Sequence, residues 1–106
     1  MKETKIYVGL NDAETLSQRY DTERYLSLLK KVCFSYHIPF SVSINEGGFF
    51  HDNGDYTEET TLVLTLMDIE DGIVNDIAKD LCVFFHQESV MITSGEVRSY
   101  FVEEKL

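Results

Sequence analysis

Apolar and polar residues alternate with a period of two along both arms of the segment from Phe40 to Met67. Alternation of this kind is typical of strands that bury one face and leave Ser, Thr and Asn on the other. The segment therefore predicts two strands that must be covered on one side. The alternating apolar positions are Val42 and Ile44 on the first arm and Leu62, Leu64 and Leu66 on the second.

A turn signal, Asn53-Gly54, lies midway between these two arms. Asn-Gly favours a two-residue type I′ turn, because both central residues of that turn need φ > 0. We therefore predict one long central β-hairpin, in which Asp52 pairs with Asp55 and His51 with Tyr56.

The pair Gly47-Gly48 interrupts the first arm of this hairpin. Glycine inside a strand often marks a bulge or a close approach of another chain segment. We expect a bulge here that bends the distal half away from the body and leaves the tip free to reach a partner.

Two further segments have the spacing of three and four residues that is typical of amphipathic helices. The first runs from Thr22 to about Tyr36, with Asp21 as its N-cap. The second follows Asp68 or Asp71, either of which can cap it. The apolar positions are Tyr25, Leu28, Leu29, Val32, Cys33 and Tyr36 in the first helix, and Ile73, Val74, Ile77, Ala78, Leu81, Phe84 and Phe85 in the second.

Short alternating runs at the two ends of the chain predict the remaining strands. Lys5 to Leu10 is a first strand, Val90 to Thr93 a fourth, and Val97 to Val102 a fifth edge strand after a turn at Ser94-Gly95. The order β-α-β-β-α-β predicts a single α+β domain over residues 1–106. It is a ferredoxin-like split β-α-β arrangement, with an antiparallel sheet of four to five strands and both helices on one face.

The strand pattern also assigns residues to the two faces of the sheet. The helix-facing set is Ile6, Val8, Val42, Ile44, Leu62, Leu64, Leu66, Val90 and Ile92. The opposite set is small, rich in hydroxyl groups and only partly apolar, and it suits a sheet-to-sheet homodimer, a shallow ligand cleft or plain solvation. It consists of Tyr7, Gly9, Ser41, Ser43, Asn45, Thr61, Val63, Thr65, Met67, Met91 and Thr93.

The composition is that of an ordinary globular protein except for a net charge of −10 over 106 residues. Such a charge opposes binding to nucleic acid or anionic membranes, and it favours a basic partner or simply solubility. Cys33 and Cys82 fall in apolar helix stripes, so we expect reduced core cysteines and a cytoplasmic location. The first ten residues do not resemble a signal peptide, and no apolar run approaches the ~20 residues of a membrane span.

Acidic residues concentrate between Lys31 and Lys79, an interval that holds no Lys or Arg. If they share one surface, they present a negative field to a basic partner. If they do not, they cap turns and helix ends individually. The nine acids are Glu46, Asp52, Asp55, Glu58, Glu59, Asp68, Glu70, Asp71 and Asp76.

The sequence contains no catalytic signature. His86, Glu88 and Glu59 are the groups to test as acid and base, because neither cysteine has an evident partner and no Ser lies in a nucleophile elbow. His51, Asp52 and Asp55 around the turn match no metal motif, so we expect neither a metal nor a cofactor.

Several short motifs resemble a bacterial family, domain-of-unknown-function family 3574. They are Gly9-Leu10, Gly48-Phe49, Gly54 with Glu59, Leu62-Val63-Leu64, and Phe85 followed by Gln87-Glu88-Ser89-Val90. The resemblance covers most of the chain and implies a small α+β domain of similar topology. It transfers no activity, and it nominates Glu59, Gln87 and Glu88.

Two hypotheses of function follow from these patterns. The first is a small acidic, non-enzymatic interaction protein: an inhibitor of the anti-CRISPR type that mimics nucleic acid, blocks a basic surface of a nucleic-acid-binding complex, and forms a homodimer. The second is a ferredoxin-like dimer that binds or converts a small molecule. Its cleft would contain Tyr7, Glu59, His86, Gln87 and Glu88.

Overall fold

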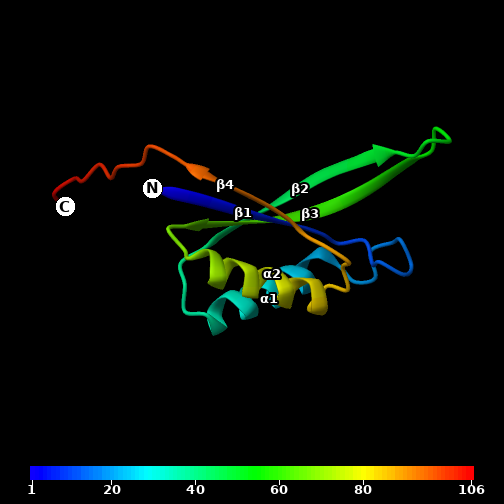
Figure 1. The fold of residues 1–106 in the computed structure, drawn as a ribbon, viewed down its shortest axis with the longest axis horizontal. Helices are drawn as coiled ribbons and strands as arrows, with labels where there is room; N and C mark the ends of the chain where they lie inside the picture. The colour runs from blue at the N-terminus through cyan, green and yellow to red at the C-terminus, as the bar shows by residue number, and fades with distance from the viewer.

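The computed structural model describes residues 1–106 and has six elements in the order strand, helix, strand, strand, helix, strand (Figure 1). The four strands form one antiparallel sheet in the order β2-β3-β1-β4, and both helices cover the same face of it. The predicted α+β, ferredoxin-like fold is confirmed, with four strands. The elements are β1 (Lys2–Gly9), α1 (Thr22–Ser35), β2 (Ser41–Phe50), β3 (Tyr56–Met67), α2 (Asp71–Phe84) and β4 (Met91–Glu96).

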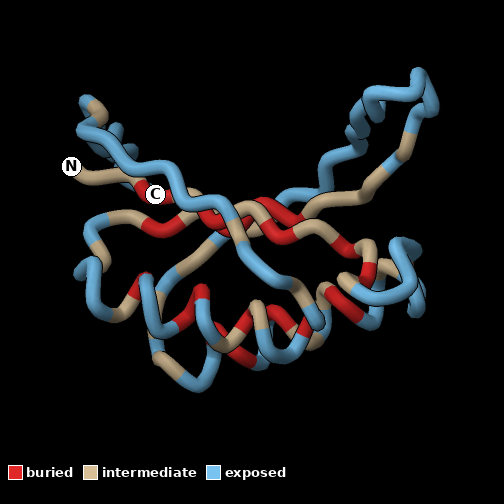
Figure 2. Tube along the Cα trace, turned by 45° about the vertical axis from the view of Figure 1, so that its right-hand side comes forward, coloured by how far each residue is buried: buried red, intermediate tan, exposed pale blue.

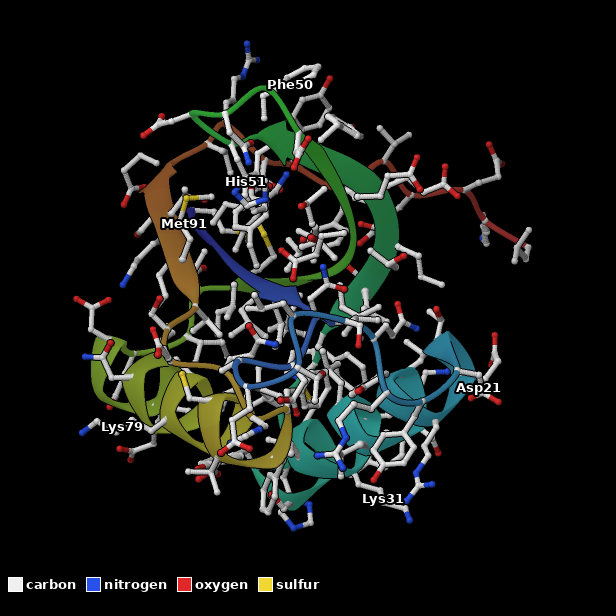
Figure 3. All side chains as sticks on the ribbon, turned by 90° about the vertical axis from the view of Figure 1, so that its right-hand side faces the viewer. Asp21, Lys31, Phe50, His51, Lys79 and Met91 are labelled. Atoms are coloured by element: carbon white, nitrogen blue, oxygen red, sulfur yellow. The ribbon has the colours of Figure 1, made fainter.

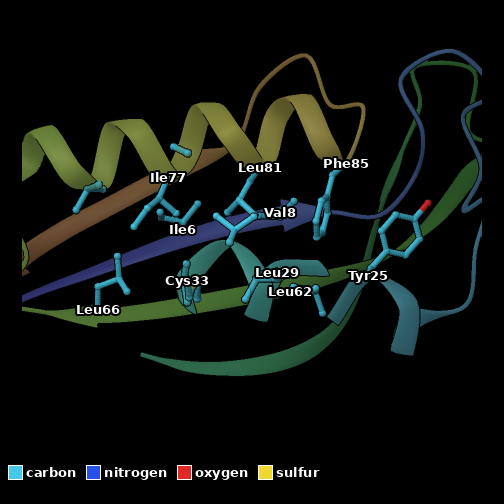
Figure 4. Packing of buried hydrophobic residues seen from close by; sticks show 14 of the residues in the cluster. Ile6, Val8, Tyr25, Leu29, Cys33, Leu62, Leu66, Ile77, Leu81 and Phe85 are labelled. Carbon is cyan, nitrogen blue, oxygen red and sulfur yellow. The ribbon is translucent and has the colours of Figure 1, made fainter. Parts of the chain in front are cut away.

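The core lies between the sheet and the two helices, where Figure 2 shows the buried segments facing one another. β1 and β3 are the central strands, and their alternate residues point toward the helices, as the period of two predicts. Val42 and Val90 pack against this core, whereas Ile44 and Ile92, at the outer strands, remain partly exposed. Residues in the cluster include Ile6, Val8, Leu29, Cys33, Leu62, Leu64, Leu66, Ile77, Leu81 and Phe85 (Figure 4).

The two helices begin in different ways. Asp21 caps α1 as predicted, because its side chain accepts a hydrogen bond from the Arg24 N–H at 2.9 Å. The cap predicted for α2 is wrong: Glu70 occupies that position without a side-chain bond. Asp68 instead accepts the backbone N–H of Lys2 at 2.7 Å, and Asp71 pairs with the Lys2 ammonium. These two acids therefore fasten the start of β1 to the segment before α2.

The hairpin turn differs from the prediction by one residue. β2 and β3 pair from Ser41 with Thr65 to Phe50 with Tyr56, and the His51 N–H then donates to the Asp55 carbonyl at 2.7 Å. The loop therefore has three residues rather than two, and only Gly54 has a positive φ, of 92°. The Asn53 side chain accepts the Asp55 N–H at 3.0 Å, and this Asx interaction replaces the predicted type I′ turn.

The bulge predicted at Gly47-Gly48 is absent, because Gly47 pairs with Glu59 and Gly48 with Glu58 in an uninterrupted ladder. Gly48 is explained by close approach instead. A Cβ atom there would come within 2.5 Å of the Tyr56 Oη. The distal hairpin nevertheless extends well beyond the helices, so the prediction of a projecting tip is confirmed (Figure 1).

The fifth strand predicted at Val97 to Val102 is also absent. Ser94 and Gly95 do not form a turn, because they pair with Thr4 and Glu3 inside β4. The Val97 backbone bonds to Met1, and the rest of the tail has no regular structure. A segment without a neighbouring strand cannot satisfy a sheet ladder, whatever its β-propensity.

The sheet face opposite the helices carries Tyr7 between Val63 and Met91 on the neighbouring strands. Val63 is buried there, whereas Met91 is more than half exposed. The homodimer through this face stays a prediction. Both cysteines are free, as predicted, and neither helix has the length and apolar character to span a membrane.

Candidate functional site

The loop that follows β1 is organised by the side chain of Asp12. A backbone bridge between Asn11 and Gln18 closes the loop. Inside it, Asp12 Oδ1 accepts the N–H groups of Glu14 at 2.9 Å and Thr15 at 3.3 Å. Asp12 is 3% exposed, which is unusual for a carboxylate and requires partners of this kind. We call the segment from Asn11 to Gln18 the Asp12 loop.

The end of α2 holds the Asp12 loop in place. His86 Nδ1 lies 2.8 Å from Asp12 Oδ2, and the His86 carbonyl accepts the Ala13 N–H at 3.0 Å. The Gln87 side chain donates to the Asn11 carbonyl at 2.6 Å. Two adjacent residues after α2 thus contact three adjacent residues of the loop.

The contact between Asp12 and His86 favours the charged form of each group. The hydrogen bond from His86, with those from the Glu14 and Thr15 N–H groups, lowers the pKa of Asp12 from 3.8 to about 2, against the opposing effect of burial. The hydrogen bond to Asp12, and its charge, raise the pKa of His86 above 6.5. The imidazole is therefore stabilised as a cation and is a poor general base.

Glu59 lies where β3 passes the Asp12 loop. The Asn11 N–H donates to Glu59 Oε2 at 3.1 Å, and the Asn11 side chain donates to the Glu58 carbonyl at 3.1 Å. The Glu59 carboxylate also lies directly against Gly9, where any side chain would displace it. Its position is thus determined by the end of β1, by Asn11 and by its own strand.

Two cavities open beside Glu59 and share Glu59 and Asn11 as walls. The first, of about 470 Å³, is lined mainly by polar residues. The second, of about 410 Å³, combines apolar and polar side chains. Both sizes are within the range of small-molecule sites. The first contains Gln18, Glu46, Tyr56 and Glu58, and the second contains Leu16, Phe49, His51, Gln87 and Glu88.

The cleft predicted from sequence is brought together in part. Glu59, Gln87 and Glu88 line the second cavity, and His86 adjoins it through Asp12. Tyr7 does not line either cavity. Sequence reasoning missed Asn11 and Asp12, although the pattern Asp-x-Glu-Thr is compatible with an Asx turn that buries the aspartate.

The nine acids fall into two groups at opposite ends of the sheet. Glu46, Glu58 and Glu59 surround the first cavity, and Asp52 and Asp55 lie at the hairpin tip. Asp68, Glu70 and Asp71 lie beyond the other end of β3, about 30 Å along the strand from Glu59, and Asp76 lies within α2. Figure 3 looks at the hairpin end of the molecule and shows Phe50 and His51 above the helices that carry Lys31 and Lys79.

Metal binding finds no support in the geometry. No group of three or more His, Cys, Asp or Glu side chains lies close enough together to hold a metal ion. His51, the histidine nearest the hairpin turn, instead contacts the Thr57 hydroxyl at 2.6 Å.

Comparison with known proteins finds likeness in structure alone. No family model matches the chain, so the resemblance to domain-of-unknown-function family 3574 stays a prediction. No curated protein matches. A solved structure of a phage SAM (S-adenosylmethionine) lyase with S-methyl-5′-thioadenosine is similar over 90% of this chain and 80% of that chain, with a TM-score of 0.66 and 22% identity. A phage SAM lyase in the apo state is similar over 96% and 92%, with a TM-score of 0.64 and 17% identity.

These similarities correct the predicted function. At such identities they show the shared fold. Both of these structures are of a phage SAM lyase, one of them in complex with S-methyl-5′-thioadenosine, and this overturns the prediction of a non-enzymatic, nucleic-acid-mimicking inhibitor. The basic protein partner was inferred on the same grounds and stays untested.

Proposed function

We propose that the protein is a lyase that cleaves S-adenosylmethionine at the cavities beside Glu59. The observation that carries the proposal is a pair of adjoining cavities, one acid-lined and one partly apolar, in a fold shared with a phage SAM lyase. The second hypothesis from the sequence, a domain that binds or converts a small molecule near Glu59 and Glu88, is compatible with this site.

The charge of the site supports a cationic substrate. S-adenosylmethionine carries a sulfonium and an ammonium group against one carboxylate, so its net charge is positive. Glu46, Glu58 and Glu59 line the first cavity without a Lys or Arg among the residues that form it. Glu46 and Glu58 are exposed and Glu59 is half-buried, so the three carboxylates together present a negative field that attracts such a cation.

The second cavity supports the nucleoside part of the same molecule. Phe49 and Leu16 supply apolar surface, and Phe49 lies edge-on to His51 with the ring centroids 4.8 Å apart. Gln87 and Glu88 supply hydrogen-bonding groups suited to a purine edge or to ribose hydroxyls. Because Glu59 belongs to both cavities, it lies where the sulfonium would join the two parts of the substrate.

The chemistry needs neither water nor an electron donor. The bond between sulfur and Cγ breaks with both electrons passing to sulfur, which gives neutral S-methyl-5′-thioadenosine. The amino-acid fragment either closes to a lactone, when its own carboxylate attacks Cγ, or loses a proton from Cβ and becomes unsaturated. In lactone formation Glu59 would orient the sulfonium cation. In the elimination it is placed to accept the proton from Cβ.

The test is incubation of the purified protein with S-adenosylmethionine, followed by chromatography and NMR of the products. We expect S-methyl-5′-thioadenosine in equal amount with a lactone or an unsaturated amino acid, which also distinguishes the two courses. Glu59→Gln should lower the rate at least tenfold. Glu70→Gln, an acid at the far end of the sheet, is the matched control. Absence of both turnover and binding by the wild-type protein would overturn the proposal.

A further inference from the structure

We propose that Asp12 and His86 are a positioning pair for Glu59: their contact fixes the Asp12 loop so that the Asn11 N–H is held on the Glu59 carboxylate. The inference rests on the proposed function, in which Glu59 faces the substrate. His86 lines neither cavity, and Asp12, although it lies at the wall of the second, is 3% exposed, so both act through Asn11 rather than on the substrate. Their role is to hold the group that orients Glu59.

The chain of contacts is short. Asn11 precedes Asp12 directly, so the position of Asp12 determines where the Asn11 N–H points. Asp12 in turn accepts His86 on one carboxylate oxygen, at 2.8 Å, and two backbone N–H groups of its own loop on the other. His86 and Glu59 are therefore connected through two residues, on segments far apart in the sequence.

Asn11 is held at its N–H, at its carbonyl and at its side-chain NH2. Its N–H donates to Glu59, its carbonyl accepts the Gln87 amide, and its side chain donates to the Glu58 carbonyl. Displacement of the loop by a fraction of an ångström would strain each of these bonds. Misplacement on that scale is enough to lower enzyme rates substantially.

The backbone of His86 has a left-handed conformation. His86 follows the C-cap of α2 with φ of 53°, a position at which helices usually carry Gly. His37 follows α1 in the same conformation, so the conformation alone does not mark a site. What distinguishes His86 is the contact of its imidazole with Asp12, the one buried carboxylate.

The charged groups that face this pair come from the Asp12 loop and the segment after it. Glu14 Oε1 lies 3.7 Å from His86 Nε2, and Arg19 Nη1 lies 3.6 Å from Asp12 Oδ2. Glu14 favours the cationic imidazole and Arg19 opposes it. Loss of the His86 proton as the pH rises weakens the contact with Asp12, so the position of Asn11 should follow the titration of His86.

The experiment compares His86→Gly with His37→Gly. His37 follows α1 in the same left-handed conformation, with φ of 53°, and is exposed, which makes it a matched control for relief of strain. His86→Gly removes the imidazole without forcing a strained residue into its place, so folding should survive. Asp12→Asn is a second variant, which removes the negative charge of the pair and keeps the imidazole of His86.

Two readouts are needed. The first is the chemical shift of the Asn11 amide, followed with pH in ¹⁵N-labelled protein. In the wild type this shift should change with pH as His86 titrates. In His86→Gly it should move toward the shift that the Asn11 amide has in Glu59→Gln. In His37→Gly it should equal the wild-type shift. The second is turnover of S-adenosylmethionine. His86→Gly should lower kcat about 10- to 100-fold with little change in KM, and should remove the alkaline limb of the pH profile.

The two readouts separate this proposal from the proposed function. If the protein does not turn over S-adenosylmethionine, the Asn11 amide still decides whether the pair positions the contact with Glu59. If the amide and kcat are the same in His86→Gly and His37→Gly, the positioning role is overturned. An amide that moves while kcat stays constant would also overturn it, because Glu59 would then work without the contact.

Discussion

The carboxylate of Glu59 lies against Gly9, so that a Cβ atom added at Gly9 would come within 2.5 Å of Glu59 Oε2. Gly9 lies on β1 and Glu59 on the neighbouring strand β3, and both are on the sheet face opposite the helices. Gly9→Ala should therefore displace Glu59 from both cavities. We expect turnover to fall about tenfold or more, measured as release of S-methyl-5′-thioadenosine.

The same substitution should have little effect on folding, because the atoms that it displaces are the end of a flexible side chain. Gly95→Ala is the matched control, since Gly95 also lies in a strand and has open space around it. Equal activities of Gly9→Ala and Gly95→Ala would show that the position of Glu59 is not critical.

The Asp12–His86 pair predicts how stability depends on pH. The pKa of Asp12 is lower in the folded state, so its contribution is present above pH 3.8 and is lost as the pH falls toward about 2. The pKa of His86 is raised, so its contribution is complete below pH 6.5 and is lost as the pH rises through the folded-state value. Thermal unfolding should thus show the largest stabilisation by the pair between about pH 4 and 6.5.

His86→Gly should remove the loss on the alkaline side of this profile, and Asp12→Asn should remove the losses on both sides. Calorimetry from pH 2 to pH 9 measures all three proteins. If the stability of the wild type and of both variants depends on pH in the same way, the stabilising contact between Asp12 and His86 is contradicted.

The fold could be predicted because its signals are local. Alternation in β1 and β3, helical spacing in α1 and α2, and the cap at Asp21 each depend on residues close together in the chain. The predictions were wrong where the local structure depends on a distant segment of the chain. Asp68 does not cap α2, because its carboxylate accepts the backbone N–H of Lys2 instead. Val97 to Val102 has β-propensity but no neighbouring strand to pair with.

The candidate site was predictable only in part for the same reason. Glu59, Gln87 and Glu88 could be nominated from the sequence, but Asn11 and Asp12 could not. Their importance comes from contacts with residues up to 76 positions away in the sequence, which no periodicity reveals. The charge pattern misled more seriously, because acids near in sequence lie at opposite ends of a long strand.

The same substitution at two glycines should change stability in opposite directions. Gly54 closes the hairpin loop with φ of 92°, so Gly54→Ala should destabilise the protein by about 1 kcal/mol or more. Gly72 lies in the first turn of α2 with open space around it, and Gly72→Ala should stabilise by about 0.5–1 kcal/mol. Urea unfolding measures the change in the free energy of unfolding for both variants. Changes in the same direction would contradict either the loop geometry at Gly54 or the start of α2 at Gly72.

Thr4 offers a test of the core itself. Its side chain is 2% exposed on the helix-facing side of β1, beside Leu66, and its hydroxyl has no hydrogen-bond partner. A buried hydroxyl without a partner costs about 1–3 kcal/mol, and Val has nearly the same shape with a higher preference for strands. Thr4→Val should therefore stabilise the protein by about 1 kcal/mol in urea unfolding.

Thr93→Val is the control for Thr4→Val, because Thr93 is exposed on β4, and its replacement should change stability by less than about 0.5 kcal/mol. A destabilised Thr4→Val would mean that the hydroxyl is bonded in solution, for which a buried water is the candidate. Such a water would lie between β1 and the helices. The core at this end of the sheet would then be polar rather than purely apolar.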